Sequence, residues 1–294
     1  VKYLHLLPLV AKGSKKHRVK GFQKDFEKAT KKDVQSFLAE VNQSDYANWT
    51  KSDFRVALKR FYRWLRDLPD GENPPETKWI KIGNRMKQIL PEELLTEEDV
   101  LKMLQACENS RDRAFLLCVD ETGGRIGELL NLRRRHVRFD DYGAILSFSG
   151  KTGDRPVRIV VGAPSLAHWM SDNPEKDPDC PLWIVIGDKN HGEPLLYDPA
   201  RKLLQRLAKR GGVKKRVNPQ SFRHSRSSRL ASVLTERQME KYLGWVPGSK
   251  MPRVYVHLSG RDVDPAILRL HGMEKETSKP QRPKLTVVTC PRCN

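Results

Sequence analysis

The stretch from Asn218 to Tyr255 holds residue types suited to chemistry on a phosphodiester. Arg223 lies on a segment that begins Asn218-Pro219, and Tyr255 follows an irregular run with two prolines and a glycine. Pro219 is typical of the first turn of a helix, and Gly244 is a plausible helix end. An arginine grips phosphate through charge-assisted hydrogen bonds, and a phenol can attack phosphorus as a nucleophile. The two residue types together suggest phosphodiester chemistry without a metal.

A second candidate segment runs from Glu121 to Leu132 and places an arginine at a helix start. Gly123 and Gly124 end one predicted helix, and Arg125 opens the next, where it shares a face with Glu128. A cation at a helix N-terminus is unfavourable by roughly a few tenths of a kcal/mol. Binding of an anionic ligand would explain why an arginine stands at this helix start. The alternative is that Arg125 is only a surface residue paired with Glu128.

A third candidate is Lys151, in the turn of a predicted β-hairpin. Residues 144–148 and 156–161 are typical of strands, and Gly150-Lys151-Thr152-Gly153-Asp154 separates them. A lysine on an exposed turn is usually only solvated. The segment is not a phosphate-binding P-loop, because its glycine spacing is wrong and no helix follows directly.

These three segments together resemble the tyrosine recombinases of the phage-integrase and Xer type, and most of all the integrases of archaeal mobile elements. The family pattern is His-x-x-Arg-His-(Ser/Thr), then Leu-Gly-(His/Trp), then a tyrosine. The family's first box is Thr-Gly-x-Arg-x-x-Glu-Leu, and a mobile catalytic lysine lies on a β-hairpin. This sequence departs at Gln220, where the family usually has histidine. The matching residues are Thr122, Gly123, Arg125, Glu128, Leu129, Lys151, Arg223, His224, Ser225, Leu243, Gly244, Trp245 and Tyr255.

The resemblance implies a mechanism of strand cleavage and rejoining. Tyr255 would attack the scissile phosphate and leave a 3′-phosphotyrosine and a free 5′-hydroxyl. Arg125 and Arg223 would hold the non-bridging oxygens, and Lys151 would protonate the leaving 5′-oxygen. The implied enzyme is a site-specific DNA recombinase or integrase that needs neither metal nor ATP, so we expect no cofactor.

The remaining site residues receive supporting roles from the same resemblance. Trp245 would pack the tyrosine arm and donate its indole N–H to phosphate, and Glu128 would orient Arg125 or a neighbouring group. His224 would have a structural hydrogen-bonding role. Gln220 can donate a hydrogen bond, but it cannot act as a base near neutral pH.

The expected fold is mostly α with a small β-sheet, in two domains that form a C-shaped clamp on duplex DNA. We expect a helical core-binding (SAM-like) domain over 1–68, a linker over 69–91, a catalytic domain over 92–272 and a tail over 273–294. Periodicity and capping patterns predict helices at about 2–11, 31–42, 51–67, 111–120, 197–210 and 262–271. Thr96 and Thr235 begin two capping boxes.

The net charge of +19 on 294 residues favours a polyanionic partner, and nucleic acid first. We expect double-stranded DNA attachment sites as the partner, with a homotetramer on two sites and a monomer or weak dimer in free solution. No apolar run approaches the ~20 residues of a membrane span, and five scattered cysteines indicate a reducing compartment, the cytoplasm. The candidate DNA-binding residues are Arg55, Lys59, Arg63, Lys81, Arg85, Lys214, Lys215 and Arg216.

Two other functions stay open on the sequence. Gln220 supports a catalytically impaired DNA-binding or regulatory protein that kept the fold, and a type IB topoisomerase-like enzyme would share the Arg/Lys/Tyr chemistry. Cys290-Pro291-Arg292-Cys293 resembles half of a zinc ribbon without its second pair, so we expect no metal there.

Overall fold

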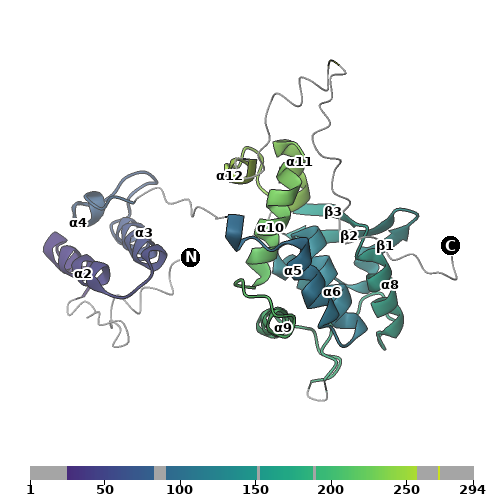
Figure 1. Ribbon diagram of the computed structural model, residues 1–294. Coiled ribbons are helices and arrows are strands. Elements are labelled where there is room, and N and C mark those ends of the chain that lie inside the picture. Colours follow the sequence, from purple (N-terminus) through teal and green to yellow (C-terminus); the bar gives the residue numbers. More distant parts are fainter. Residues whose placement is uncertain (1–24, 83–90, 151–152, 188–189, 257–270, 272–294) are drawn as a thin grey trace. The chain divides into compact units, whose positions relative to one another are not determined.

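The computed structural model describes residues 25–82, 91–150, 153–187, 190–256 and residue 271 (Figure 1). The chain divides into two compact units, Val1–Lys87 and Gln88–Asn294. The described part of the first unit is helical, and the second combines helices with one small sheet, so the predicted class, mostly α with a small β-sheet, is confirmed. The helix expected over 2–11, nearly all of the one over 262–271, and the Cys290–Cys293 pair lie outside the described residues.

The first unit packs α2 (Lys31–Gln43), α3 (Asn48–Leu65) and the short α4 (Pro75–Lys78) around one core. The apolar stripe predicted on α3 faces that core, where Phe54, Leu58 and Tyr62 are buried. Both longer helices begin within a few residues of their predicted starts. Thr30 and Asp33 form a capping box at the start of α2.

The first unit also extends beyond residue 68, into the stretch expected to be a linker. Pro75 occupies the first turn of α4, where a proline is well tolerated. Ile80 is buried in the core of this unit, and Trp79 packs against it. Pro75 therefore begins a helix inside the expected linker, and the boundary between the two units, after Lys87, lies near the C-terminal end of that 69–91 stretch.

The second unit is built mainly from helices. Thr96 and Thr235 cap α5 and α11 through their hydroxyl groups, as their capping boxes predicted. Helix α8 was not predicted. The helices are α5 (Glu97–Gln105), α6 (Ser110–Thr122), α7 (Ile126–Leu130), α8 (Ala163–Asp172), α9 (Tyr197–Arg210), α10 (Pro219–Ala231), α11 (Glu236–Leu243) and α12 (Met251–Val256), with 3-10 turns at Pro91–Glu93 and Arg134–His136.

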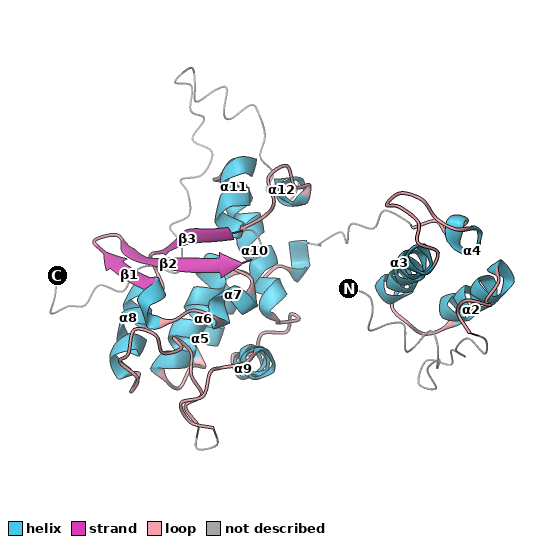
Figure 2. Cartoon of the chain, turned by 180° about the vertical axis from the view of Figure 1, so that it is seen from behind, coloured by secondary structure: helices cyan, strands magenta, loops and turns pink. Residues whose placement is uncertain are grey.

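One antiparallel sheet, in the order β1-β2-β3, completes the second unit. Its strands are β1 (Val137–Asp140), β2 (Gly143–Gly150) and β3 (Gly153–Ile159). Gly150 pairs with Gly153, which confirms the predicted hairpin, although Lys151 at its tip lies outside the described residues. Figure 2 shows α6 and α8 along one side of the sheet and α11 beside β3. Alternate residues of β2 enter the core, including Leu146 and Phe148.

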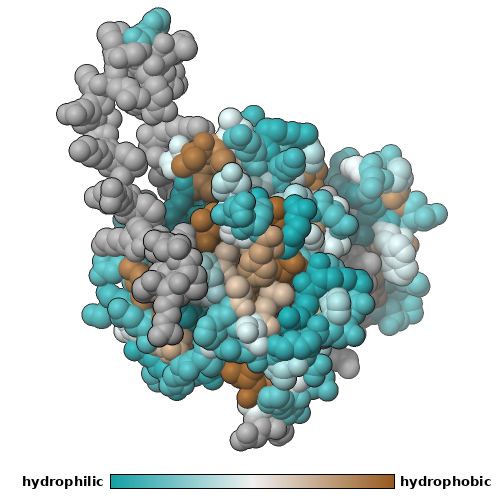
Figure 3. Space-filling model, turned by 90° about the vertical axis from the view of Figure 1, so that its right-hand side faces the viewer, coloured by the Kyte–Doolittle hydropathy of each residue, from teal (hydrophilic) through white to brown (hydrophobic). Residues whose placement is uncertain are grey.

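The face in Figure 3 is largely hydrophilic where it is coloured, with a smaller hydrophobic area near its centre. Within the described ranges, no helix is both long enough and apolar enough to cross a membrane.

Candidate catalytic site

The C-terminal end of α11 is the point at which the candidate residues meet. Gly244 caps this helix in the left-handed conformation, with φ +64°, so α11 ends where the sequence predicted. The last carbonyl groups of a helix lack intrahelical partners and carry a partial negative charge. Three arginines from three segments donate to three consecutive carbonyls here: Arg155 Nε to Tyr242 O at 3.0 Å, Arg223 Nη2 to Leu243 O at 2.8 Å and Arg125 Nη2 to Gly244 O at 2.8 Å.

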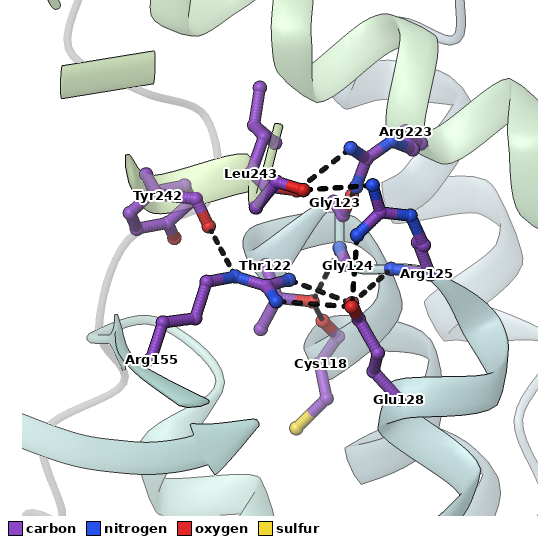
Figure 4. Close-up of polar contacts among 11 residues, drawn as sticks. Cys118, Thr122, Gly123, Gly124, Arg125, Glu128, Arg155, Arg223, Tyr242 and Leu243 are labelled. Atoms are coloured by element: carbon purple, nitrogen blue, oxygen red, sulfur yellow. Dashed lines mark hydrogen bonds and ion pairs between the residues drawn. The ribbon is translucent and has the colours of Figure 1, made fainter. Parts of the chain in front are cut away.

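Glu128 links two of these arginines (Figure 4). Arg125 Nη1 donates to Glu128 Oε1 at 3.0 Å, and Arg155 donates to both carboxylate oxygens, at 3.1 and 2.7 Å. Burial alone would raise the pKa of Glu128, but the hydrogen bonds and charge of Arg155, with those of Arg125, bring that pKa below its ordinary value. Glu128 therefore stays ionised and bonds to both Arg125 and Arg155. Its role in orienting an arginine for catalysis stays a prediction.

Arg155 is a site residue that the sequence reading missed. Its side chain is 7% exposed, and its guanidinium lies over the Phe148 ring at 5.2 Å from the centroid. A signal was present in the alternation of β3, because Val157 and Ile159 are buried and Arg155 shares their face. A buried arginine needs an acidic partner, and Glu128 provides it.

Arg223 lies deeper in the site than Arg125. It is 5% exposed and also donates from Nη1 to Gly123 O at 2.9 Å. Burial, and next the nearby charge of Arg125, lower the pKa of Arg223 to about 10, so the guanidinium keeps its charge at neutral pH. Arg125 is 42% exposed at its side chain. The two cations that the sequence assigned to phosphate thus lie close together, and one of them is accessible.

Tyr255 lies on α12, against Trp245. The two rings stack at 5.7 Å between centroids and 10° between planes, and the Arg223 guanidinium lies over the Trp245 ring at 5.5 Å. The segment expected as an irregular arm thus ends in a short helix, with Pro252 in its first turn. Tyr255 is 1% exposed. Its burial raises the pKa of the phenol to about 12, against an opposing effect of Arg223.

His224 contacts the phenol directly. The distance between His224 Nδ1 and Tyr255 Oη is 2.5 Å. The hydrogen bond expected of His224 is therefore made with the candidate nucleophile, Tyr255. Gln220 lies one turn earlier on α10 and is exposed. Lys151, the remaining expected catalytic residue, is outside the described residues.

Some of the residues predicted to bind DNA make hydrogen bonds within the protein, and others are exposed. In the first unit, Lys59 Nζ donates to Ile80 O at 3.2 Å, and Arg63 donates to Asp70 Oδ1 at 2.8 Å. Arg55 Nη2 donates to Asn42 Oδ1 at 2.7 Å. These three side chains hold their own unit together, while Lys81 is exposed and Arg85 lies outside the described residues.

The basic cluster before α10 is similarly divided. Lys214 and Arg216 are exposed. Lys215 Nζ is instead bonded to Asp99 Oδ2 and to Leu94 O, both at 2.7 Å. Lys215 therefore ties this loop to the start of α5, a role that its position in a basic run did not indicate. DNA contact by any of these residues stays a prediction.

Comparison with known proteins places this site in a family. The Phage integrase family matches residues 93–261, more than half of the chain. Tyrosine recombinase XerA of Pyrococcus furiosus is 24% identical over 248 residues, which cover 83% of this chain and 82% of the relative. The chain belongs to the phage integrase family, and the resemblance to tyrosine recombinases is confirmed.

Solved structures of related recombinases share the fold. The XerH site-specific recombinase, in a post-cleavage complex with a palindromic difH substrate, is similar at a TM-score of 0.65 and 18% identity, over 84% of this chain and 74% of that one. A lambda integrase tetramer bound to a Holliday junction is similar at a TM-score of 0.63 and 17% identity, over 89% and 72% of the two chains.

Proposed function

We propose that this protein is a site-specific DNA recombinase that cleaves and rejoins DNA strands through a 3′-phosphotyrosine on Tyr255, and so integrates or excises a mobile element. The observation that carries the proposal is the arrangement at the end of α11. Arg125 and Arg223 bond to adjacent carbonyls there, and Arg223 lies over the indole that stacks on Tyr255. One short segment thus holds the two arginines proposed to bind phosphate and the tyrosine proposed as the nucleophile.

The two arginines would stabilise the charge that develops on the phosphate oxygens during attack. Removal of one such charge-assisted contact costs about 3 kcal/mol of transition-state stabilisation, or a factor of ~10² in rate. Glu128 and the α11 carbonyls orient the guanidinium groups before substrate arrives, which lowers the cost of reorganisation. Lys151 would protonate the leaving 5′-oxygen, Trp245 would donate its indole N–H to phosphate, and Gln220 would donate from the first turn of α10.

The proposed partner is duplex DNA. The net charge of +19 favours a polyanion, and the similar XerH and lambda integrase structures hold DNA substrates. A phosphotyrosine conserves the energy of the phosphodiester bond, so a hydroxyl group of a second DNA can reseal the strand without ATP. Exchange between two sites would then engage four protomers, as in the tetramer of the lambda enzyme.

The test is covalent capture from a library of nicked duplexes with randomised sequence. A nick beside the cut releases the short 5′-hydroxyl fragment, so cleavage cannot reverse and the protein stays attached to DNA in a denaturing gel. Wild type is expected to give covalent adducts whose DNA converges on one sequence. Tyr255→Phe should give none, and Tyr142→Phe, at an exposed tyrosine on the β1–β2 turn, should behave as wild type.

A second function, a catalytically impaired DNA-binding protein, is favoured by one residue only. Gln220 stands where the family usually has histidine, and it is exposed on α10. DNA binding that falls steeply with salt, without an adduct for wild type, would support this reading and refute the recombinase.

A further inference from the structure

We propose that His224 is the catalytic base that takes the proton from Tyr255 as the phenol attacks DNA, and so supplies the function that Gln220 lacks. This inference rests on the proposed recombinase activity. The sequence reading gave His224 a structural role only.

The geometry of α10 and α12 carries the proposal. His224 Nδ1 and Tyr255 Oη are 2.5 Å apart, within the range of a strong hydrogen bond. The two rings lie 6.0 Å apart between centroids, at 33°. His224 directly follows Arg223 on α10, so one helical turn carries both a phosphate-gripping cation and the base next to the nucleophile.

The proposed step sets the protonation states that it needs. The phenol is protonated at neutral pH, and its burial raises its pKa to about 12. Proton transfer requires that the phenol donates its O–H and that Nδ1 of His224 accepts, so the proton of the imidazole would lie on Nε2. A phenol in this state is a weak nucleophile, and an adjacent base activates it.

The proposed step is balanced in atoms and electrons. Tyr255 Oη forms a bond to phosphorus while its proton passes to the lone pair of His224 Nδ1. The bond between phosphorus and the 5′-oxygen breaks, and that oxygen takes a proton from Lys151 and leaves as a hydroxyl group. In resealing, the imidazolium returns the proton to Tyr255 as the 5′-hydroxyl of the incoming strand attacks phosphorus and gives its own proton to Lys151.

Gln220 is poorly suited to this step. A primary amide does not accept a proton near neutral pH, and this side chain is exposed one turn before His224. It can still donate a hydrogen bond to phosphate, so Gln220 would supply that donor while His224 accepts the proton.

The experiment measures single-turnover adduct formation on the nicked duplex captured by wild type. His224→Asn and His224→Ala are expected to slow cleavage by roughly 10²-fold, within the range for loss of a general base. Noncovalent DNA binding, measured with each substitution added to Tyr255→Phe, should stay within about threefold of Tyr255→Phe alone. His168→Ala, at an exposed histidine on α8, is the matched control and should cleave at the wild-type rate.

Two further readouts separate a base from a structural residue. Free imidazole should restore much of the rate of His224→Ala, and it should leave wild type and His168→Ala unchanged. A substrate with sulfur in place of the leaving 5′-oxygen needs no proton donor, because a thiolate is a good leaving group. That substrate should rescue Lys151→Ala and leave His224→Ala slow.

Each outcome decides the proposal. Cleavage by His224→Asn at the wild-type rate would overturn it, as would a slow His224→Ala that imidazole does not rescue. Rescue of His224→Ala by the sulfur substrate would assign His224 to the leaving group instead and also overturn it. If wild type itself forms no adduct, the recombinase proposal fails, and any role of His224 in cleavage fails with it.

Discussion

The substitution Glu128→Gln tests whether the carboxylate between Arg125 and Arg155 holds the site together. Gln keeps the shape of the side chain but removes the negative charge. The amide oxygen can still accept from both guanidinium groups, as Oε1 does now. The amide N–H₂ group, however, takes the place of Oε2 and cannot accept from Arg155 Nη2. Arg155 would remain 7% exposed with its charge uncompensated.

The expected loss follows from that burial. Breaking a buried ion pair by removing one partner costs about 3–5 kcal/mol of unfolding free energy. Arg155 keeps its bond to Tyr242 O and its contact with the Phe148 ring, so we expect a value near the lower end, about 3 kcal/mol. For a domain of this size that corresponds to a fall in Tm of about 6–12 °C.

The assay is thermal unfolding, followed by the near-ultraviolet signal of the buried Trp183 and Trp169 in the second unit. Asp140→Asn is the matched control. It removes the carboxylate of another bidentate pair, with Arg158 on the same strand β3, at 2.7 Å to each oxygen, but that pair lies on the surface. Its Tm should change by a small fraction of the Glu128→Gln effect. Equal shifts for the two variants would refute the reasoning from burial.

Three further predictions concern Tyr255, Gly150 and Lys215. The Tyr255 phenol should titrate near pH 12. Because its pKa is raised in the folded state, its neutral form contributes roughly 2–3 kcal/mol to the free energy of unfolding; this contribution is complete below pH 10 and is lost as the pH rises toward 12. A difference titration against Tyr255→Phe with a midpoint near pH 10 would contradict this. Gly150→Ala would place a Cβ 2.4 Å from Glu128 Oε1 and should cost about 1–3 kcal/mol, whereas Gly187→Ala, in open space, should leave Tm unchanged. Lys215→Met should lower Tm without changing the salt dependence of DNA binding, because Lys215 bonds to Asp99. Lys214→Met should leave Tm constant and reduce the slope of log affinity against log salt by about 1. The reverse pattern would show that Lys215, and not Lys214, contacts DNA.

Local patterns predicted much of the second unit from the sequence. The helix over 197–210 has the predicted bounds, the hairpin pairs as expected, and Gly244 ends α11. These features depend on residues close in the chain: an apolar stripe with helical period, turn glycines between alternating strands, and a residue that tolerates positive φ.

Features fixed by distant contacts could not be predicted in the same way. Strand β1 has only four residues, and its last three are exposed, so no alternation marked it. The prolines near Pro75 were typical of a linker, but Ile80 and Trp79 pack back on the first core. The contact between His224 and Tyr255 joins α10 and α12, which are separated in the sequence by α11. The spacing of the two residues in the sequence does not predict this contact.

The most direct test of the proposed chemistry is to locate the covalent bond between protein and DNA. The captured adduct would be digested with nuclease and protease, and the modified peptide sequenced by mass spectrometry. The account predicts a nucleotide joined through its 3′-phosphate to Tyr255, together with a free 5′-hydroxyl on the released strand. A nucleotide on any other residue, or a 5′-phosphate linkage to Tyr255, would contradict it.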